Sequence, residues 1–255
     1  MRRLERNVVE PGPFSREEGA PQGGLVSPVL SHIDLHDVLD LWFEKRFAGT
    51  CTGRAYLIRY ADDDVACFEY EGDARAFLTE MTARLAQFDL EVEPSKTALL
   101  RFGSEQLGRT RAETPGPRTF SFLGLTHYVG KSRTGRFVVG RKTDGKRVRK
   151  KLALLSERLR GLRAQGGRAM VAYLIRHLRG HIQYYGVSGN SRGVSGYLYA
   201  ATGLLFKWLN RRSQRRSLTW KRFYAVIKPM LPTARILHDL YPVPWWKTQA
   251  GSRMV

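Results

Sequence analysis

Two runs of strand-forming residues, joined by consecutive aspartates, constrain the fold of this chain more than any other feature. Residues 54–60 (RAYLIRY) and 65–68 (VACF) are rich in aromatic and β-branched side chains, which is typical of strands. Residues 61–64 (ADDD) lie between them and predict an antiparallel hairpin with an acidic tip. Apolar residues recur at helical spacing on both sides. They predict one helix from Ser27-Pro28 to about Phe47 and another from Asp73, its expected cap, to Phe88.

The pattern then changes along the chain from mixed to helical. Further strands are expected over residues 98–102, 120–125 and 136–139, with a Gly/Pro-rich loop at 103–119. From Arg147 onward, a stripe of leucines predicts a helix that ends near Gly166-Gly167. Two more helices are expected over about 170–185 and 197–209. The sequence therefore predicts an α+β fold, with an antiparallel sheet and packed helices in residues 1–145 and a basic helical region in residues 146–255.

The positive charge of the chain is concentrated in its second half. Residues 1–130 hold 15 Lys and Arg against 20 Asp and Glu, a net charge of −5, whereas residues 131–255 hold 28 against three, a net charge of +25. Such asymmetry indicates a polyanionic partner, because each cation placed on a phosphate releases counterions. Interleaved aromatic residues could stack on bases, so nucleic acid is favoured over an anionic membrane surface. They are Tyr184, Tyr185, Trp208, Trp220, Phe223 and Tyr224.

The remaining composition narrows the class of protein. No stretch approaches the roughly 18 consecutive apolar residues of a membrane helix, and no signal-type apolar core follows the N-terminus. We therefore expect a soluble, cytoplasmic protein of bacterial type with no membrane partner, and association with the nucleoid would be compatible with its charge. Cys51 and Cys67 fit neither a zinc spacing nor a disulfide framework and are expected to be buried thiols. Trp208 and Trp220 are expected to pack in the helical core.

The acidic tip is the candidate site of chemistry. Crowded carboxylates repel one another unless a cation is present, and Mg²⁺ prefers oxygen ligands of this kind. In a two-metal site such ions hold the attacking and leaving oxygens of a phosphoryl transfer. The alternative is a solvated acidic loop without function, which is common in turns.

Four segments of the first half together resemble a reverse transcriptase. Residues 60–63 (YADD) match the Tyr-Ala-Asp-Asp box of that family, and residues 20–28 (APQGGLVSP) resemble its Pro-Gln-Gly segment. Residues 95–97 (SKT) resemble its later lysine motif, and residues 122–124 (FLG) resemble its primer-grip hairpin. The four segments occur in the order and at the spacings of the family.

The resemblance implies a role for each matched residue in RNA-directed DNA synthesis. Asp62 and Asp63 would be the catalytic, Mg²⁺-binding residues of a two-metal site. The nucleotide and template would lie beside Tyr60, Lys96 and a loop in which Gly23 permits close backbone approach. The full list of residues implied on the nucleotide side is Pro21, Gln22, Gly23, Tyr60 and Lys96, and the implied primer grip is Phe122, Leu123 and Gly124.

The basic half resembles the thumb, or maturase X, region of group II intron proteins. The segments that carry this resemblance are residues 178–190 (LRGHIQYYGVSGN), 208–216 and 218–220. The resemblance implies a palm in residues 1–145 and a helical thumb in residues 146–255 that binds intron RNA or an RNA template–primer, with target DNA as a further partner. The alternative for the cluster at 211–216 is a solvated helix end. The candidate RNA-binding residues are Arg147, Arg149, Lys150, Lys151, Arg211, Arg212, Arg215 and Arg216.

Three departures from the family pattern bear on activity. The family supplies another metal-binding Asp well before the Pro-Gln-Gly loop, and the 20 residues before this loop hold only Glu5, Glu10, Glu17 and Glu18 as carboxylates. We therefore expect a C-terminal fragment without fingers that polymerises poorly alone, with an upstream chain as a candidate partner in trans. Asp64 follows the Asp pair, so a one-residue slip would make Asp63-Asp64 the tip. No Cys/His cluster of an appended nuclease is present.

Other interpretations remain open from the sequence. The chain could be a non-catalytic RNA-binding maturase module in which the palm serves as a scaffold. It could also be the degraded remnant of a mobile element, whose partial sheet would expose unpaired edges. A DNA nuclease that uses the acidic turn is a more distant alternative.

Overall fold

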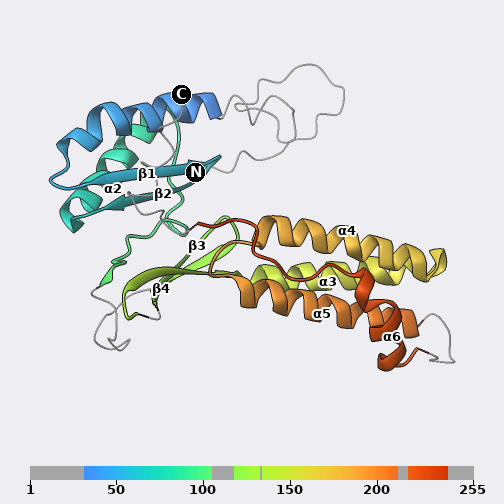
Figure 1. The fold of residues 1–255 in the computed structure, drawn as a ribbon. Coiled ribbons are helices and arrows are strands. Elements are labelled where there is room, and N and C mark those ends of the chain that lie inside the picture. Colours follow the sequence, from blue (N-terminus) through green and yellow to red (C-terminus); the bar gives the residue numbers. More distant parts are fainter. Residues whose placement is uncertain (1–31, 105–117, 133, 212–217, 241–255) are drawn as a thin grey trace, which may run out of the picture. The chain divides into compact units, whose positions relative to one another are not determined.

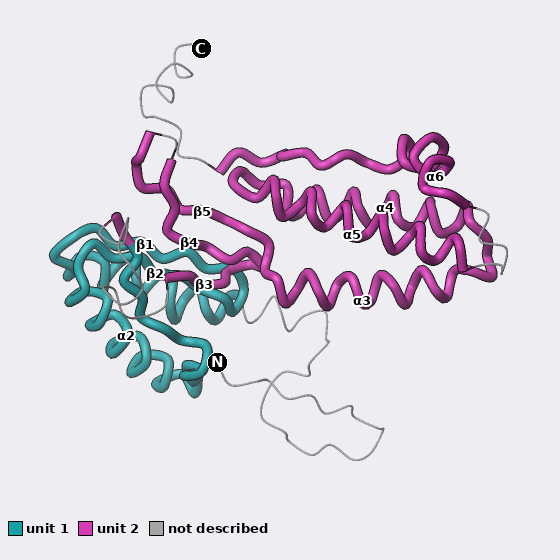
Figure 2. The backbone as a smooth tube through the Cα atoms, turned by 90° about the horizontal axis from the view of Figure 1, so that it is seen from below, with its two compact units in different colours: residues 1–102 teal, residues 103–255 magenta. Residues whose placement is uncertain are grey.

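The computed structural model describes residues 32–104, 118–132, 134–211 and 218–240. The chain forms two compact units, Met1–Phe102 and Gly103–Val255 (Figure 2). The described part combines antiparallel sheets with helices, so the predicted α+β fold is confirmed. The units divide after Phe102, whereas the division expected after residue 145 is a functional boundary that stays a prediction.

The first unit packs helices on one face of a two-stranded sheet (Figure 1). The sheet is the predicted hairpin of β1 (Ala55–Tyr60) and β2 (Asp63–Phe68). Residues 32–50 are helical and include η1 (His36–Asp40), η2 (Phe43–Phe47) and η3 (Ala48–Thr50), and α2 (Glu71–Ala86) follows the hairpin. Aromatic rings form the centre of this core, where Phe43 and Phe47 stack and both contact Phe68 and Phe77 edge-on.

Two expectations for the first unit are wrong, and the expected start of the first helix lies outside the described residues. Asp73 does not cap α2: the N-cap is Tyr70, and the Asp73 carboxylate instead accepts a hydrogen bond from the Gly53 backbone N–H at 3.1 Å. Gly53 is required there, because a Cβ atom would lie 2.7 Å from the Tyr70 ring. Residues 98–102 form no strand: none of the described strands pairs with them, and a strand needs a partner for its backbone hydrogen bonds.

The second unit begins with a three-stranded antiparallel sheet. Its strands are β3 (Thr119–Phe122), β4 (Leu125–Lys131) and β5 (Phe137–Thr143), paired in that order. The strand expected over 120–125 is therefore wrong, because a tight turn divides it at Leu123 and Gly124. Both turn residues take positive φ, 49° and 75°, which is the geometry of a two-residue hairpin loop whose twist matches the flanking strands.

Three long helices form the body of the second unit (Figure 1). They are α3 (Gly145–Gly161), α4 (Gly167–Tyr185) and α5 (Ser191–Asn210), followed by the short α6 (Trp220–Val226) and η6 (Lys228–Met230). After α3 the turn η5 (Leu162–Gln165) ends at Gly166, whose φ of 97° stops the helix where the sequence predicted. Leucines of α3, α4 and α5 form one buried core. Within the described ranges, none of these helices has the length and apolar character that a membrane crossing requires.

A buried asparagine joins the sheet to the helices of the second unit. Asn190, between α4 and α5, is 1% exposed. Its side-chain oxygen accepts from the Thr143 N–H at 2.8 Å, and its amide donates to the Thr143 hydroxyl and the Tyr185 carbonyl at 2.8 and 2.9 Å. Every polar atom of the amide group is thus paired, which a buried amide requires. This contact holds the end of β5 against the α4–α5 corner.

A second buried cluster lies between α3, α4 and α5. The His181 ring stacks on Tyr197, with centroids 3.8 Å apart, and its Nδ1 lies 3.4 Å from the Lys151 amine. The Lys151 amine also lies over the rings of Tyr185 and Tyr197, so its positive charge is placed on aromatic faces. Burial, and secondarily the Lys151 charge, lowers the pKa of His181 to about 3, and burial also lowers the pKa of Lys151. The imidazole is therefore neutral in the folded protein.

The cluster predicts that acid destabilises the second unit. In the unfolded chain His181 takes up a proton near its ordinary pKa of 6.5, whereas in the folded protein it stays neutral down to about pH 3. Stability is therefore fully present above about pH 6.5 and falls as pH decreases, by at most about 1.4 kcal/mol per pH unit. Urea unfolding at pH 7, 6 and 5 measures this slope.

His181→Gln is expected to reduce the slope, and His32→Gln in the first unit, at an exposed position, is the control. His177 retains part of the slope in the variant, because burial also lowers its pKa. Equal slopes for the native chain and His181→Gln would contradict this assignment.

Candidate functional site

The acidic hairpin turn is tighter than the sequence predicted. Only Ala61 and Asp62 lie between the strands, and Asp63 opens β2 opposite Tyr60. Ala61 takes a φ of 56°, in the left-handed region that non-glycine residues enter rarely. The one-residue slip that would place Asp63-Asp64 at the tip does not occur. Asp62 is thus at the turn itself, and Asp63 is the first paired residue after it.

The pleat of the sheet sends the neighbouring aspartates to different faces. Tyr60 pairs with Asp63, on the face where Tyr60 is 66% exposed. Arg59 pairs with Asp64, on the face that carries Leu57 and the helical core. Since successive side chains of a strand alternate between faces, Asp63 and Asp64 cannot act together. Asp62 and Asp63 are both exposed and are the carboxylates available to a ligand.

Arg59 connects the helix, the strand and the turn. Its Nε and Nη2 donate to the two carboxylate oxygens of Asp40 at 2.8 and 2.5 Å, and its Nη1 donates to the Ala61 carbonyl at 2.9 Å. The Arg59 side chain is 10% exposed, so this two-pronged ion pair is shielded from water, where such pairs are strongest. The Arg59 hydrogen bond holds the pKa of Asp40 below its ordinary value. The guanidinium thus holds the turn backbone against η1.

Asp64 has the electrostatics of a crowded carboxylate. Although the residue is exposed overall, loss of water around its carboxyl group raises its pKa, and repulsion from Asp63 raises it further. The Arg59 charge acts in the opposite direction. Negative charge on Asp64 is therefore costly, mainly because the carboxyl group loses water and secondarily because Asp63 is close.

The turn supplies part of a metal site. Asp62 and Asp63 offer the carboxylate oxygens that Mg²⁺ prefers. Within the described ranges, however, no three Asp, Glu, His or Cys side chains come together in a group that could hold a metal ion. Further ligands would have to come from other residues, and Glu5 and Glu10 lie outside the described residues, as do Pro21, Gln22 and Gly23 of the predicted nucleotide loop.

Lys96 of the predicted triphosphate side lies in an exposed turn. Its backbone N–H donates to the Glu93 carbonyl at 3.1 Å. The turn is further held by Ser95, whose hydroxyl and N–H both donate to the Glu93 carboxylate, at 2.7 and 3.2 Å. These bonds lower the pKa of Glu93 below its ordinary value. None of the ion pairs in the described part of the chain joins Lys96 to the acidic turn, so a shared role stays a prediction.

The predicted primer grip is the β3–β4 turn, and it belongs to the second unit. Phe122 ends β3, and Leu123 and Gly124 form the turn. The Tyr184 hydroxyl of α4 donates to the Leu123 carbonyl at 3.0 Å. A Cβ atom on Gly124 would lie 2.9 Å from the Tyr185 hydroxyl and 3.3 Å from the Arg147 guanidinium. The turn is therefore held close to α3 and α4, and glycine is required there.

The candidate RNA-binding residues divide into exposed and inward-facing ones. Arg147, Arg149 and Lys150 are exposed in the first turns of α3, and Asp144 caps the helix by accepting from the Lys146 and Arg147 N–H groups. Lys151 instead points to His181 and two tyrosines, a packing role that sequence reasoning missed. A role for Lys151 in binding RNA stays a prediction.

Arg211 of the predicted cluster is the C-cap of α5 and directly follows its last residue, Asn210. The residue is exposed, and its guanidinium lies over the Trp208 ring. Trp208 itself is 9% exposed and donates to the Ser156 hydroxyl, which confirms its expected place in the core. Arg212, Arg215 and Arg216 lie outside the described residues.

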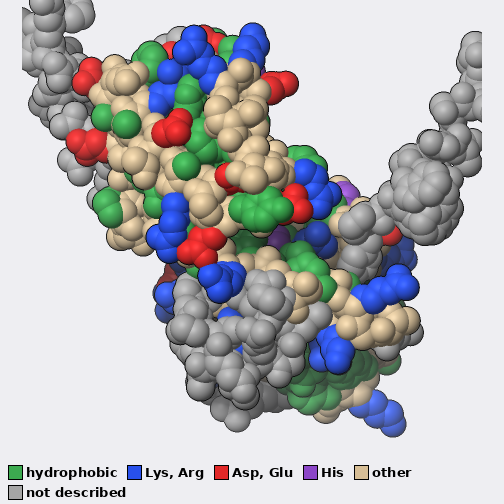
Figure 3. All heavy atoms as spheres, turned by 90° about the vertical axis from the view of Figure 1, so that its left-hand side faces the viewer, with side chains coloured by type: hydrophobic (Ala, Val, Ile, Leu, Met, Phe, Trp, Pro, Cys, Tyr) green, Lys and Arg blue, Asp and Glu red, His purple; other side chains and the backbone are tan. Residues whose placement is uncertain are grey.

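Arg59 and Asp40 are site residues that sequence reasoning missed. A signal was present, since Arg59 occupies the position in β1 that alternation assigns to the buried face, two residues after Leu57. A charged residue at such a position needs a buried partner. The sequence could not say which of several nearby carboxylates would supply it. Figure 3 shows acidic and basic side chains interspersed on the face that it draws, so charge alone does not single out Asp40.

The fold and the acidic turn of the first unit can be compared with those of polymerases and with known protein families. An antiparallel hairpin with exposed aspartates at its turn and helices on one face is the arrangement expected of a polymerase palm. The family described as "Reverse transcriptase (RNA-dependent DNA polymerase)" matches residues 3–127, which include the acidic turn and the β3–β4 turn. The match supports reverse transcriptase for this part of the chain. No curated protein matches the sequence.

Replacement of Arg59 tests whether the ion pair holds the acidic turn. Arg59→Lys keeps the charge but loses the two-pronged geometry and the bond to the Ala61 carbonyl. We expect amide hydrogen exchange at residues 62–64 to become at least about tenfold faster, since a loss of about 1.4 kcal/mol of local stability has that effect.

The matched control is Arg54→Lys in the residue just before β1, where Arg54 and its partner Glu69 are both exposed. It should leave exchange at the turn unchanged. If Arg59→Lys also left it unchanged, the turn would not depend on this ion pair.

Proposed function

We propose that this chain is a reverse transcriptase/maturase of the group II intron type. Its first half would take part in RNA-directed DNA synthesis, and its basic helical half would bind intron RNA or an RNA template–primer to promote splicing and mobility. The observation that carries the proposal is the pair Asp62 and Asp63, exposed at a turn held by Arg59, inside the segment that matches the reverse transcriptase family.

The residues of the turn support this chemistry in a defined way. In DNA synthesis a primer hydroxyl attacks the innermost phosphorus of the nucleotide, and pyrophosphate leaves. Asp62 and Asp63 would hold Mg²⁺, which when bound supplies positive charge to the attacking and leaving oxygens. Arg59 is a positioning residue, because it contacts the turn backbone and the Asp40 carboxylate on the opposite face from Asp63.

The charge of the second unit supports RNA as the partner. Lys146, Arg149 and Lys150 are exposed on α3, whose Leu155 and Leu159 are buried. No carboxylate lies in the first two turns of that helix, so the basic face is not neutralised along its own element. We also propose that the protein contacts target DNA and that a further chain completes its metal site. The proposed location is the cytoplasm.

A second candidate is a non-catalytic RNA-binding module. It is favoured by the absence, within the described ranges, of a third metal-binding side chain beside the acidic turn. In that case the first unit would be a scaffold for the basic helices. RNA binding would then survive any change at Asp62 and Asp63.

Primer extension separates the two candidates. The purified chain is given an RNA template, a DNA primer, Mg²⁺ and four deoxynucleotides, with Asp62→Ala/Asp63→Ala as the test variant. We expect the double variant to lose extension by at least about a hundredfold, since metal-bound charge supplies several kcal/mol to such transition states.

The matched control for this experiment is Asp34→Ala/Asp37→Ala, which removes two exposed carboxylates from the helical segment of the same unit. It should extend primers like the native chain. Equal activity of the double variant at the turn would contradict a catalytic role, and absent extension in the native chain with intact RNA binding would favour the module.

Salt dependence tests the basic face of α3. Each phosphate contact contributes roughly 0.7–0.9 to the slope of log affinity against log salt concentration. Lys146→Gln/Arg149→Gln/Lys150→Gln is expected to reduce the slope for duplex RNA by about 2, measured by fluorescence anisotropy. The control Lys45→Gln/Arg46→Gln/Arg54→Gln removes three exposed cations from the first unit. A smaller slope change in the α3 variant than in the control would rule out this face.

A further inference from the structure

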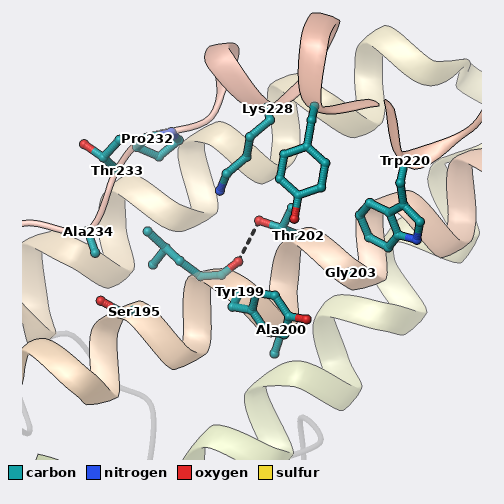
Figure 4. Close-up of a pocket in the computed structure, with 12 residues that line it drawn as sticks. Ser195, Tyr199, Ala200, Thr202, Gly203, Trp220, Lys228, Pro232, Thr233 and Ala234 are labelled. Carbon is teal, nitrogen blue, oxygen red and sulfur yellow. Dashed lines mark hydrogen bonds between the residues drawn. The ribbon is translucent and has the colours of Figure 1, made fainter. Parts of the chain in front are cut away.

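An open cavity in the second unit lies apart from the residues assigned so far. It is bounded by α5, α6 and the segment after η6, and its volume is about 360 Å³ (Figure 4). This is within the range of about 300–1,000 Å³ that is usual for small-ligand sites. The lining residues that matter below are Tyr199, Thr202, Gly203, Trp220, Tyr224 and Lys228.

Aromatic rings stand exposed around this cavity. Tyr199 is 77% exposed, Tyr224 50% and Trp220 45%. The expectation that Trp220 packs in the core is therefore wrong: its ring stacks on Phe206 with centroids 3.6 Å apart, but Phe206 is itself only partly buried at the edge of the core and Trp220 remains exposed. Trp220 and Tyr224 lie 5.7 Å apart in a tilted pair. Large aromatic surface left in water at a concave site is typical of binding, because packing alone would cover it.

The polar groups of the cavity are cationic or neutral. Figure 4 shows the Lys228 side chain directed into the cavity from η6. Its amine forms no ion pair with any described residue. No Asp or Glu is among the described residues that line the cavity. The Thr202 hydroxyl is already used, since it donates to the Leu198 carbonyl at 2.7 Å. The cavity therefore combines stacking surfaces with one cation that lacks a counter-charge.

We propose that this cavity binds one unstacked nucleotide of single-stranded RNA, with the base against the exposed rings and a phosphate on Lys228. Every base has a π-face, so stacking on tyrosine and tryptophan suits a strand of any sequence. The lysine supplies the charge that a phosphate requires. The inference rests on the proposed function for the class of partner, and it adds a single-strand site distinct from the basic face of α3.

The cavity fits a nucleotide of a strand better than it fits other ligands that carry only a negative charge or only one nucleotide. An acidic peptide would use Lys228 but would leave the aromatic surfaces without a planar partner. A free nucleoside monophosphate shares the base and the phosphate, so it must be separated from a strand by experiment. The overall charge of +20 favours the strand, because neighbouring phosphates add to its attraction to the chain.

Gly203 allows the cavity to be filled without removing any group. A Cβ atom on this helical glycine would meet nothing within 4 Å, so Gly203→Leu places a side chain into open space, and leucine also favours the helix. Gly180 on α4 is the matched control: it is exposed, also meets nothing within 4 Å and does not line the cavity. Tyr199→Ala and Tyr199→Phe test stacking directly, and Lys228→Gln is paired with the exposed Lys221→Gln.

The experiment uses the full chain and two RNA probes of equal length. One is a ten-nucleotide oligoadenylate with 2-aminopurine at its centre, and the other is a blunt RNA duplex. Affinity is measured by fluorescence anisotropy at one ionic strength, and stacking by quenching of the 2-aminopurine. Adenosine monophosphate and an oligoglutamate peptide serve as competitors. Circular dichroism and thermal unfolding establish that each variant is folded.

We expect selective loss of single-strand binding. Gly203→Leu and Tyr199→Ala should bind the oligoadenylate at least about fivefold more weakly, since stacking on an aromatic ring contributes about 5- to 150-fold per base. Both should bind the duplex within about twofold of the native chain. Tyr199→Phe, Gly180→Leu and Lys221→Gln should behave like the native chain. Lys228→Gln should reduce the salt slope for the single strand by about 0.7.

Other outcomes overturn the inference. Native-like oligoadenylate binding and quenching by folded Gly203→Leu and Tyr199→Ala would show that the cavity takes no base. Equal losses for both probes would place these residues on a general RNA surface. If adenosine monophosphate displaces the oligoadenylate at concentrations lower than those at which the strand itself binds, the site is assigned to a free nucleotide. If oligoglutamate displaces it more strongly than adenosine monophosphate does, the site is assigned to an acidic peptide. Absence of any RNA binding by the native chain would instead contradict the proposed function itself.

Discussion

The Arg59–Asp40 ion pair is the interaction on which the acidic site depends. Arg59 joins β1 and the turn that follows it to η1, and all three nitrogens of its guanidinium donate hydrogen bonds to do so. A hairpin turn with a non-glycine residue at positive φ is costly by about 1–3 kcal/mol, and the bond from Arg59 to the Ala61 carbonyl offsets that cost in the folded state. The exposed pair Asp62 and Asp63 therefore projects from a defined backbone and not from a loose loop. Negative charge at the turn and positive charge beneath it are parts of one arrangement.

The second unit is organised by buried polar contacts in the same way. Asn190 ties β5 to the corner of α4 and α5, and Lys151 and His181 lie among tyrosines where three helices meet. Burial of each polar group costs free energy because the group loses water, and hydrogen bonds or aromatic contacts to neighbouring residues offset most of that cost. The β3–β4 turn, which is the predicted primer grip, is held by Tyr184 and lies close to Arg147, so it shares its scaffold with the first turns of α3. The element assigned to the palm by resemblance thus folds with the helices assigned to the thumb.

The aromatic residues of the second unit fall into a buried group and an exposed group. Trp208 and Tyr197 are buried and join helices through the Ser156 and His177 side chains. Tyr199, Trp220 and Tyr224 surround an open cavity and remain accessible. Sequence composition could not separate these two groups, because both carry aromatic side chains at helical spacing among basic residues. The difference comes from which faces of α5 and α6 are covered by neighbouring elements, and those faces are decided only when the helices pack.

The sequence by itself determined the elements whose signals are local. Alternating strand residues around 61–64, glycine at 166 and the leucine stripe of α3 specified the hairpin, the helix end and the helical body, and the four family motifs specified the reverse transcriptase match. The tertiary structure alone decided the width of the turn, the separation of Asp63 from Asp64, the partner of Arg59 and the inward direction of Lys151. It also decided that residues 98–102 form no strand and that Asp73 binds Gly53 instead of capping its helix. Local signals depend on neighbours a few residues away. The partners of Arg59, Asp73 and Lys151 lie 19, 20 and 30 residues away along the chain, so only folding selects them among competing groups.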